Sequence, residues 1–243
     1  MTMETIPYSD SDRTFTGFEG AISTRVMSHP HRSFAFEVTF DLTHPRLIAL
    51  GSQKPPLHFH PYQEEYVQVL AGRLAVEVNG REIILSSGDG EFRLKRWVDH
   101  RLYPPPSPPR GPQDDPASNP DNTTKFLLSG QQTPKAFKLD NVFFQSWYAY
   151  QDEVVVRGKT PNLIQIMATF DAGDSYLSLP RWIPLSHTIA QAAGVLIGRW
   201  LGGLLGYQPF YREWLTEEHW QLACEKMETS FFQRRFADRR HSS

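Results

Sequence analysis

Apolar and polar residues alternate along much of the first half of the chain, a pattern typical of half-buried strands. Between positions 34 and 40 every second residue is Phe or Val, and the residues between them are mostly polar. Two further apolar runs, 74–78 and 83–85, flank Asn79-Gly80. An Asn-Gly pair in that position favours a hairpin, because both central residues of the turn need positive φ. Successive strands joined in this way predict an antiparallel barrel.

Three later segments have the composition of further strands that would close this barrel. They are 141–150, 153–157 and 162–170, and the first and third are rich in aromatic or β-branched residues. If 141–150 is a strand, Phe143, Gln145, Trp147 and Ala149 share one face. That face would be either an aromatic wall of a substrate pocket or plain core.

The period becomes helical after Pro184. Apolar residues run from Ile189 to Leu205 with only Gln191 and Arg199 strongly polar, and glycine recurs at every fourth position from 194 to 206. On a helix these glycines form one strip that another backbone can approach closely. Each costs a helix roughly 0.8–1.0 kcal/mol relative to alanine, so a packing partner or a lipid setting must offset the cost.

Three arrangements remain open for this helix. It packs on the barrel or on a second subunit, or it makes a peripheral membrane contact through 188–206, or it spans a bilayer. The central Arg199 and the short uncharged run count against a full span. A second helical stretch follows within 212–240, with an arginine-rich end that we expect to be solvated.

These patterns divide the chain into an N-terminal arm (1–30), a barrel (31–183) and a C-terminal helical extension (184–243). Within the barrel, 104–136 reads as a Pro-rich loop, partly polyproline in character. It begins just after His100, near the rim of the predicted barrel. It is therefore either a lid over a site or a surface insertion without a role.

Composition narrows the class of protein. The 243 residues are 40% hydrophobic with a formal charge of -2, as in a globular protein of one large domain or slightly more. The absence of a basic stripe excludes nucleic acid as a partner. The single cysteine, Cys224, fits a reducing compartment, and the polar first thirty residues lack the apolar core of a signal peptide. We therefore expect a cytoplasmic protein, with membrane association if the glycine-bearing helix lies on lipid.

The strongest chemical signal is the segment around two histidines. His58 and His60 are two apart, so on a strand both rings point to one face. Glu65 follows after a break at Pro61 and shares a face with the apolar residues of the next strand, whereas Glu64 falls on the other face. Two imidazoles and one carboxylate are half of a metal site.

His100 is the candidate for the remaining ligand. Phe92, Leu94, Val98, His100 and Leu102 alternate with polar residues, and only Arg96 breaks the pattern, which places His100 inward. Three imidazoles and a carboxylate suit one divalent transition metal: Fe, Mn, Ni, Cu or Zn. They leave coordination positions for a substrate, water or dioxygen.

The same residues resemble the first motif of the cupin superfamily. Gly51, His58, His60, Glu65 and Gly72 occupy its positions, with one extra residue after Gly51. The second motif is present in part: Gly88-Asp89 opens it and His100 closes it. Lys95 and Trp97 stand where the motif has proline and glycine, and the segment is one residue longer.

The resemblance implies a mainly β fold, a double-stranded β-helix or jelly-roll barrel, here with a C-terminal α-helical extension. Cupins with this ligand set include dioxygenases, oxidases, decarboxylases, isomerases and epimerases. We therefore expect a metal-dependent oxygenase, isomerase or lyase in which Glu65 is a ligand or a catalytic proton shuttle. The aromatic complement favours a small, largely apolar substrate, as in a tailoring step of natural-product metabolism: oxidation, isomerisation, cyclisation or decarboxylation.

The alternative is a small-molecule-binding or metal-independent cupin with a structural role. Cupins commonly pair through their sheets, which implies a homodimer. The remaining histidines singled out are interpreted as surface or capping residues: His29, His31, His44, His187 and His219.

Overall fold

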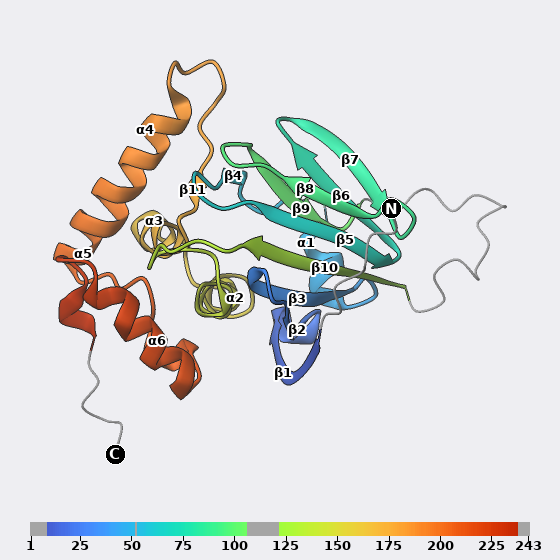
Figure 1. The fold of residues 1–243 in the computed structure, drawn as a ribbon, viewed down its shortest axis with the longest axis horizontal. Coiled ribbons are helices and arrows are strands. Elements are labelled where there is room, and N and C mark those ends of the chain that lie inside the picture. The colour runs from blue at the N-terminus through green and yellow to red at the C-terminus, as the bar shows by residue number, and fades with distance from the viewer. Residues whose placement is uncertain (1–8, 52, 106–121, 238–243) are drawn as a thin grey trace. The chain divides into compact units, whose positions relative to one another are not determined.

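A computed structural model of the protein describes residues 9–51, 53–105 and 122–237 (Figure 1). The chain divides into two compact units. The strand unit comprises Met1–Pro55, Glu64–Lys95 and His100–Gln132, and the helical unit comprises Pro56–Gln63, Arg96–Asp99 and Thr133–Ser243. The predicted combination of antiparallel sheets with C-terminal helices is confirmed.

A six-stranded antiparallel sheet forms the larger part of the strand unit, in the order β1-β2-β3-β10-β5-β8. Figure 1 shows β10 running between β3 and β5. Register places Glu65, the first residue of β5, opposite Gly130 on one side and Leu94 on the other. The strands are β1 (Ser9–Gly17), β2 (Ile22–Ser28), β3 (Arg32–Asp41), β5 (Glu65–Ala71), β8 (Glu91–Leu94) and β10 (Thr123–Gln131).

Three more strands of this unit pair around β6. The hairpin predicted at Asn79-Gly80 is confirmed: it joins β6 (Arg73–Val78) to β7 (Arg81–Ser86), and the two turn residues have φ of 52° and 79°. On its other side β6 pairs with β9 (His100–Tyr103), with Val78 opposite His100. A short helix, α1 (Pro45–Leu50), is capped by the His44 side chain, which accepts from the Arg46 backbone N–H.

The core of the strand unit follows the alternation expected for β3. Phe34, Phe36, Val38 and Phe40 are all buried. Across the sheet, Phe126 of β10 lies opposite Val38, and the rings of Phe40 and Phe126 meet edge to face at 5.2 Å between centroids. Burial of this one face fixes the register of the sheet.

Within the segment predicted as an N-terminal arm (1–30), residues 9–17 and 22–28 form the strands β1 and β2. Ile22, Thr24 and Val26 are buried and alternate with partly exposed residues, so β2 has the period of a half-buried strand. The two glycines and the many polar residues of this segment hide that short alternation. Residues 1–8 of the predicted arm lie outside the described residues.

The Pro-rich loop predicted for 104–136 is also shorter than expected. Its last part contains β10, which pairs with both β3 and β5. Thr124, Phe126 and Leu128 are the buried positions that alternate there. The predicted lid falls mainly on 106–121, which lie outside the described residues.

The three strands predicted between 141 and 170 are helices instead. α2 (Asn141–Val155) and α3 (Leu163–Ala172) begin after Asp140 and Asn162, whose side chains accept from backbone N–H groups in the first turn. In α2 the buried residues Val142, Ser146 and Tyr150 recur every fourth position. Aromatic residues stabilise a strand only where neighbouring strands offer a surface for them to pack on. In these segments the side-chain caps and the helical spacing of the buried residues outweigh the aromatic content.

The rest of the helical unit contains the paired strands β4 and β11, two of the five strands of the second sheet (β11-β4-β9-β6-β7), and the C-terminal helices. β4 (His58–Phe59) pairs with β11 (Tyr176–Leu177). α4 (Ser186–Ala193), η3 (Gly194–Leu201) and α5 (Gly202–Leu205) follow one another as a continuous helical segment, seen at the left of Figure 1. α6 (Glu217–Glu228) begins at the capping Thr216, and short 3-10 turns occupy Arg212–Trp214 and Arg234–Phe236. A third 3-10 turn, Phe18–Gly20, belongs to the strand unit.

The glycine strip of this helix does have a protein partner. A Cβ on Gly198 would lie 2.5 Å from the backbone carbonyl of Met167 in α3, and one on Gly194 would lie 2.5 Å from the Tyr176 ring. Glycine is therefore required for the backbone of η3 to approach α3. The packing of the helix against neighbouring protein, predicted as one of three arrangements, is present along this face.

Candidate metal site

The two histidines of the first motif come from one short extended segment. His58 lies on β4 and His60 follows it, and their rings are 5.0 Å apart between centroids. The Trp97 backbone N–H donates to the His60 carbonyl at 3.0 Å. Pro61 ends the segment, and Glu65 then opens β5. Spacing and strand geometry therefore put these side chains where the sequence predicted.

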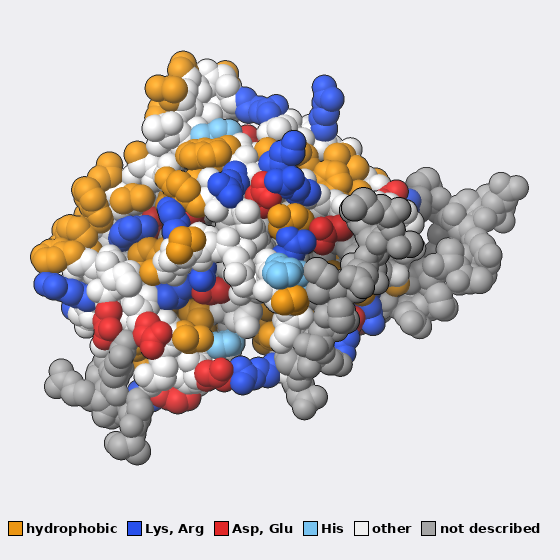
Figure 2. Space-filling model, viewed as in Figure 1, with side chains coloured by type: hydrophobic (Ala, Val, Ile, Leu, Met, Phe, Trp, Pro, Cys, Tyr) orange, Lys and Arg blue, Asp and Glu red, His pale blue; other side chains and the backbone are white. Residues whose placement is uncertain are grey.

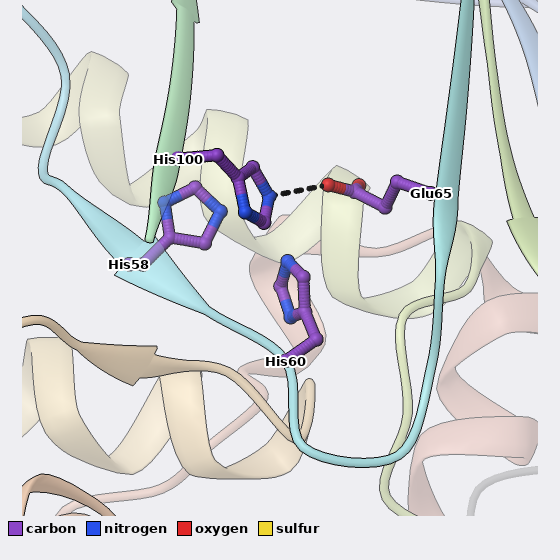
Figure 3. Close-up of side chains that lie close together, drawn as sticks. All are labelled: His58, His60, Glu65 and His100. Atoms are coloured by element: carbon purple, nitrogen blue, oxygen red, sulfur yellow. Dashed lines mark hydrogen bonds and ion pairs between the residues drawn. The ribbon is translucent and has the colours of Figure 1, made fainter. Parts of the chain in front are cut away.

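The four predicted ligands lie together (Figure 3). One ligand atom from each of His58, His60, Glu65 and His100 can be chosen so that all lie within 4.8 Å of one another. His60, Glu65 and His100 are buried, and His58 is partly exposed. The closest contact joins His100 Nε2 to Glu65 Oε2 at 2.8 Å. Within the described parts of the chain, these four residues are the group that could hold a metal ion.

Hydrogen bonds assign the tautomers of His58 and His60. His58 Nδ1 is 3.0 Å from the carbonyl oxygen of Pro56, which can only accept, so Nδ1 carries the proton. His60 Nδ1 is 3.0 Å from Ser175 Oγ, which donates its own hydrogen to the Gly173 carbonyl. Ser175 therefore accepts from His60 Nδ1–H. Both rings keep the lone pair on Nε2, as a metal ligand requires.

The donor set fits a metal ion in its chemistry. Zinc lies about 2.0–2.2 Å from histidine and carboxylate donors, so any two donors of one ion are at most about 4.4 Å apart. The four ligand atoms lie within 4.8 Å of one another, so small side-chain movements would bring them to coordination distance. Three nitrogens and one oxygen suit the borderline divalent metals named above.

Backbone conformation at the motif residues shows how the chain departs from the family pattern. Gly72, the last glycine of the first motif, has φ of 72°, where glycine is favoured. Trp97, which stands where the second motif has glycine, has φ of 63°. A bulky residue seldom adopts this conformation. The Trp97 ring stacks on Phe59 at 5.6 Å between centroids, which holds the turn before His100.

Aromatic side chains pack beside His58. The Phe170 ring of α3 meets the His58 ring edge to face at 5.8 Å, and Trp147 of α2 meets Phe170 at 4.7 Å. Phe143 lies behind them, 6.2 Å from Phe170. Of the predicted aromatic wall, Phe143 and Trp147 are thus near the site, although they come from a helix. Phe143 and Phe170 are buried, so they are core residues on the His58 side of the predicted ligands.

The other histidines singled out lie outside the group of four. His44 caps α1, and buried His219 contacts Gln145. His187 Nε2 is 2.9 Å from Asp99 Oδ1, which also accepts from Ser178. Glu64 forms an ion pair with Arg93 at 2.6 Å, as expected for a carboxylate on the opposite face from Glu65.

Sequence reasoning missed a second cluster of charges in the helical unit. Arg199, on the apolar helix, donates two hydrogen bonds to buried Asp171 at 2.6 and 2.9 Å. Burial raises the pKa of the nearby Asp174 to about 7, against the opposing effect of Lys135. Asp174 and Arg199 help to line a pocket of about 240 Å³. Neither this cluster nor Ser175 follows a motif, because the partners are far apart in the chain.

Comparisons with known proteins agree with these observations. A profile of the cupin domain matches residues 47–103. The chain is 41% identical over 235 residues to a protein of Arthrobotrys oligospora named oxidoreductase, covering 96% of this chain and 88% of that protein. It is 36% identical over 186 residues to epoxidase atD of Aspergillus terreus, covering 76% of this chain and 53% of that protein. Among solved structures, KdgF from Halomonas sp. matches with 20% identity and a TM-score of 0.33, covering 52% of this chain and 94% of that one.

Proposed function

This chain belongs to the cupin superfamily, and we propose that it is a metal-dependent oxidoreductase acting on a small, largely apolar organic molecule. The names of its relatives, oxidoreductase and epoxidase, support an oxidation as the reaction class. The observation that carries the metal dependence is the donor set of His58, His60, Glu65 and His100 within 4.8 Å.

One divalent transition ion, Fe, Mn, Ni, Cu or Zn, would be held by these four side chains. When bound, such an ion polarises a coordinated oxygen or activates dioxygen. The protein's own residues orient the donors: the Pro56 carbonyl and Ser175 Oγ hold the Nδ1 atoms of His58 and His60. Hydrogen bonds to the ring nitrogen that does not face the ion fix the orientation of the ring and raise the basicity of the ligating nitrogen.

Glu65 has a second role in this proposal, as a proton acceptor. Its Oε2 atom lies 2.8 Å from His100 Nε2, and coordination of an ion by His100 would free Oε2 either to ligate the ion or to take a proton from a substrate. Both side chains are almost fully buried, so water does not compete for that proton. A carboxylate at this position can act as a ligand in one state and accept a proton in another.

The surroundings of His58 support an apolar substrate. The neighbouring aromatic side chains Phe170 and Trp147 offer ring faces and edges rather than charges. Apolar walls with a few convergent polar groups are typical of small-molecule sites. Together with the epoxidase relative, this favours an unsaturated or aromatic molecule, such as an intermediate that a natural-product pathway tailors.

Elemental metal analysis of the purified protein tests the proposal first. Wild type should hold about one transition metal ion per chain, and His58→Ala and His100→Ala should each lose most of it. His31→Ala is the matched control, because His31 is exposed and outside the group of four. The control should retain the metal.

Oxygen uptake then tests the reaction class with the metal that the protein retains. We expect wild type and His31→Ala to consume oxygen with an apolar alkene or aromatic substrate, and the two ligand variants to consume none. Absence of metal from wild type after reconstitution would refute the metal dependence. Metal binding with turnover that consumes no oxygen would instead support a non-redox cupin reaction.

A further inference from the structure

An exposed apolar surface runs along the C-terminal helical segment. We call it the apolar face; Figure 2 shows hydrophobic side chains gathered on this side of the helical unit. Trp182 is 81% exposed and Leu204 is 64% exposed. Large exposed apolar patches mark contacts with protein or membrane. The face consists of Trp182, Leu185, Ile189, Leu196, Trp200, Leu201, Leu204, Leu205 and Phe231.

The opposite side of the same helix is tied to protein. Ala190, Gly194, Gly198 and Gly202 are its buried positions, four residues apart. Gly198 lies against the backbone of α3, and Arg199 turns inward to Asp171. Ser186–Leu205 is long and apolar enough to cross a membrane by length and composition, and only 28% of its most apolar stretch is buried. Because one side packs on α3 and carries the Arg199–Asp171 ion pair, only the apolar face is available for contact with lipid.

The distribution of charged residues around the apolar face favours a lipid surface over other partners. No Asp or Glu occurs between Asp174 and Glu213. Arg181 within that stretch lies 3.9 Å from Asp99, and its side chain is 62% exposed. Arg234 lies over the Phe231 ring at 4.6 Å. Arg235 donates to the Gly203 and Leu204 carbonyls at the end of the helix. Arginines beside exposed tryptophans match the composition of helices that lie in the interface of anionic membranes.

We propose that the apolar face docks the protein on the surface of a bilayer with anionic headgroups. Trp182, Trp200 and the leucines of α5 enter the boundary between headgroups and acyl chains, and Arg181 and Arg234 contact the headgroup phosphates. The proposal is independent of the metal site, because it uses other residues. Docking of this kind also gives the protein access to apolar molecules dissolved in the membrane.

Flotation of the full chain with vesicles tests the docking. Wild type should float with vesicles of phosphatidylcholine and phosphatidylserine. Leu204→Glu should reduce the bound fraction by about tenfold or more, since it places a charge where the exposed leucine would enter the membrane interface. Ile48→Glu is the control, because Ile48 is 63% exposed on α1, outside the apolar face. The control should float as wild type does, and circular dichroism should show all three folded.

Other outcomes would overturn the proposal. Wild type that stays with the soluble fraction, or a Leu204→Glu variant that floats fully, would refute membrane docking. A concentration-dependent dimer in analytical ultracentrifugation that Leu204→Glu dissociates, without vesicle binding, would assign the face to a second copy of the chain. Equal binding to pure phosphatidylcholine would refute the role of the arginines.

Discussion

Ser175→Ala should weaken metal binding without touching any ligand. Ser175 is almost fully buried, and its Oγ atom accepts from His60 Nδ1–H at 3.0 Å. The substitution removes only that oxygen and its hydrogen. The His60 ring then loses the contact that fixes both its orientation and its tautomer, so a fraction of the protein presents the wrong nitrogen or the wrong angle to the ion.

The expected size of the effect follows from the single contact removed. Loss of an outer-shell partner of a histidine ligand costs about 10- to 100-fold in metal affinity. That corresponds to roughly 1.4–2.8 kcal/mol of binding free energy. The other three ligands are unchanged, and His58 keeps its contact with the Pro56 carbonyl, so binding should weaken and not disappear.

Competition with a chelator of known affinity measures this change directly. Ser146→Ala is the matched control, since Ser146 is also fully buried and its hydroxyl makes no hydrogen bond within the described residues. The control should bind metal as wild type does, and both variants should keep the wild-type circular dichroism spectrum. Unchanged affinity in Ser175→Ala, beside a clear loss in His60→Ala, would refute the positioning role of Ser175.

Two further predictions concern stability in the helical unit. Gly198→Ala should destabilise the protein by about 1–3 kcal/mol in urea unfolding, because the new Cβ meets the Met167 backbone, which cannot move aside; Gly88→Ala, with open space around it, should have little effect. Asp174 lies beside Lys135, Asp171, Tyr176 and Arg199, and its pKa in the folded protein is about 7, above the usual 3.8. Between these two pH values only the folded state keeps the proton, so the free energy of unfolding falls as pH rises. Asp174→Asn should lack this decline in the free energy of unfolding, which is up to about 1.4 kcal/mol per pH unit. Relative to wild type, the variant should therefore become more stable between about pH 4 and pH 7, with no further change above pH 7. An advantage that is the same at every pH would contradict this reasoning.

The part of the site that the sequence predicted is the part that short-range rules govern. His58, His60 and Glu65 lie within eight positions, and strand geometry alone relates them. His100 is more distant, but an alternating pattern leads into it, and β9 places it opposite Val78 of β6. Ser175 is 115 residues from His60 and only tertiary structure brings it to the ring. Nothing in the sequence around a single serine indicates such a contact.

The fold was mispredicted where composition and period disagree. The segment 141–150 is aromatic enough for a strand, yet its buried positions are spaced by four and Asp140 offers a cap. The capping residue Asp140 is visible in the sequence, whereas the spacing of the buried positions is seen only in the structure. β10 was missed for the opposite reason, because its alternation follows directly on a long polar and Pro-rich stretch. β10 pairs with β3 on one side and β5 on the other, so packing against both neighbours also stabilises it as a strand.

The glycine-bearing helix shows why hydropathy alone could not choose among its three arrangements. By length and composition, 186–205 is one apolar stretch. The structure divides it into a glycine face packed on α3 and an apolar face of large side chains. Arg199, the residue that counted against a full membrane span, turns toward Asp171 and leaves the apolar face uncharged at that position. The two faces should therefore respond separately to substitution. Gly198→Ala acts on the free energy of unfolding and Leu204→Glu on vesicle binding. If Leu204→Glu instead unfolded the protein, the apolar face would be part of the fold and membrane docking would lose its basis.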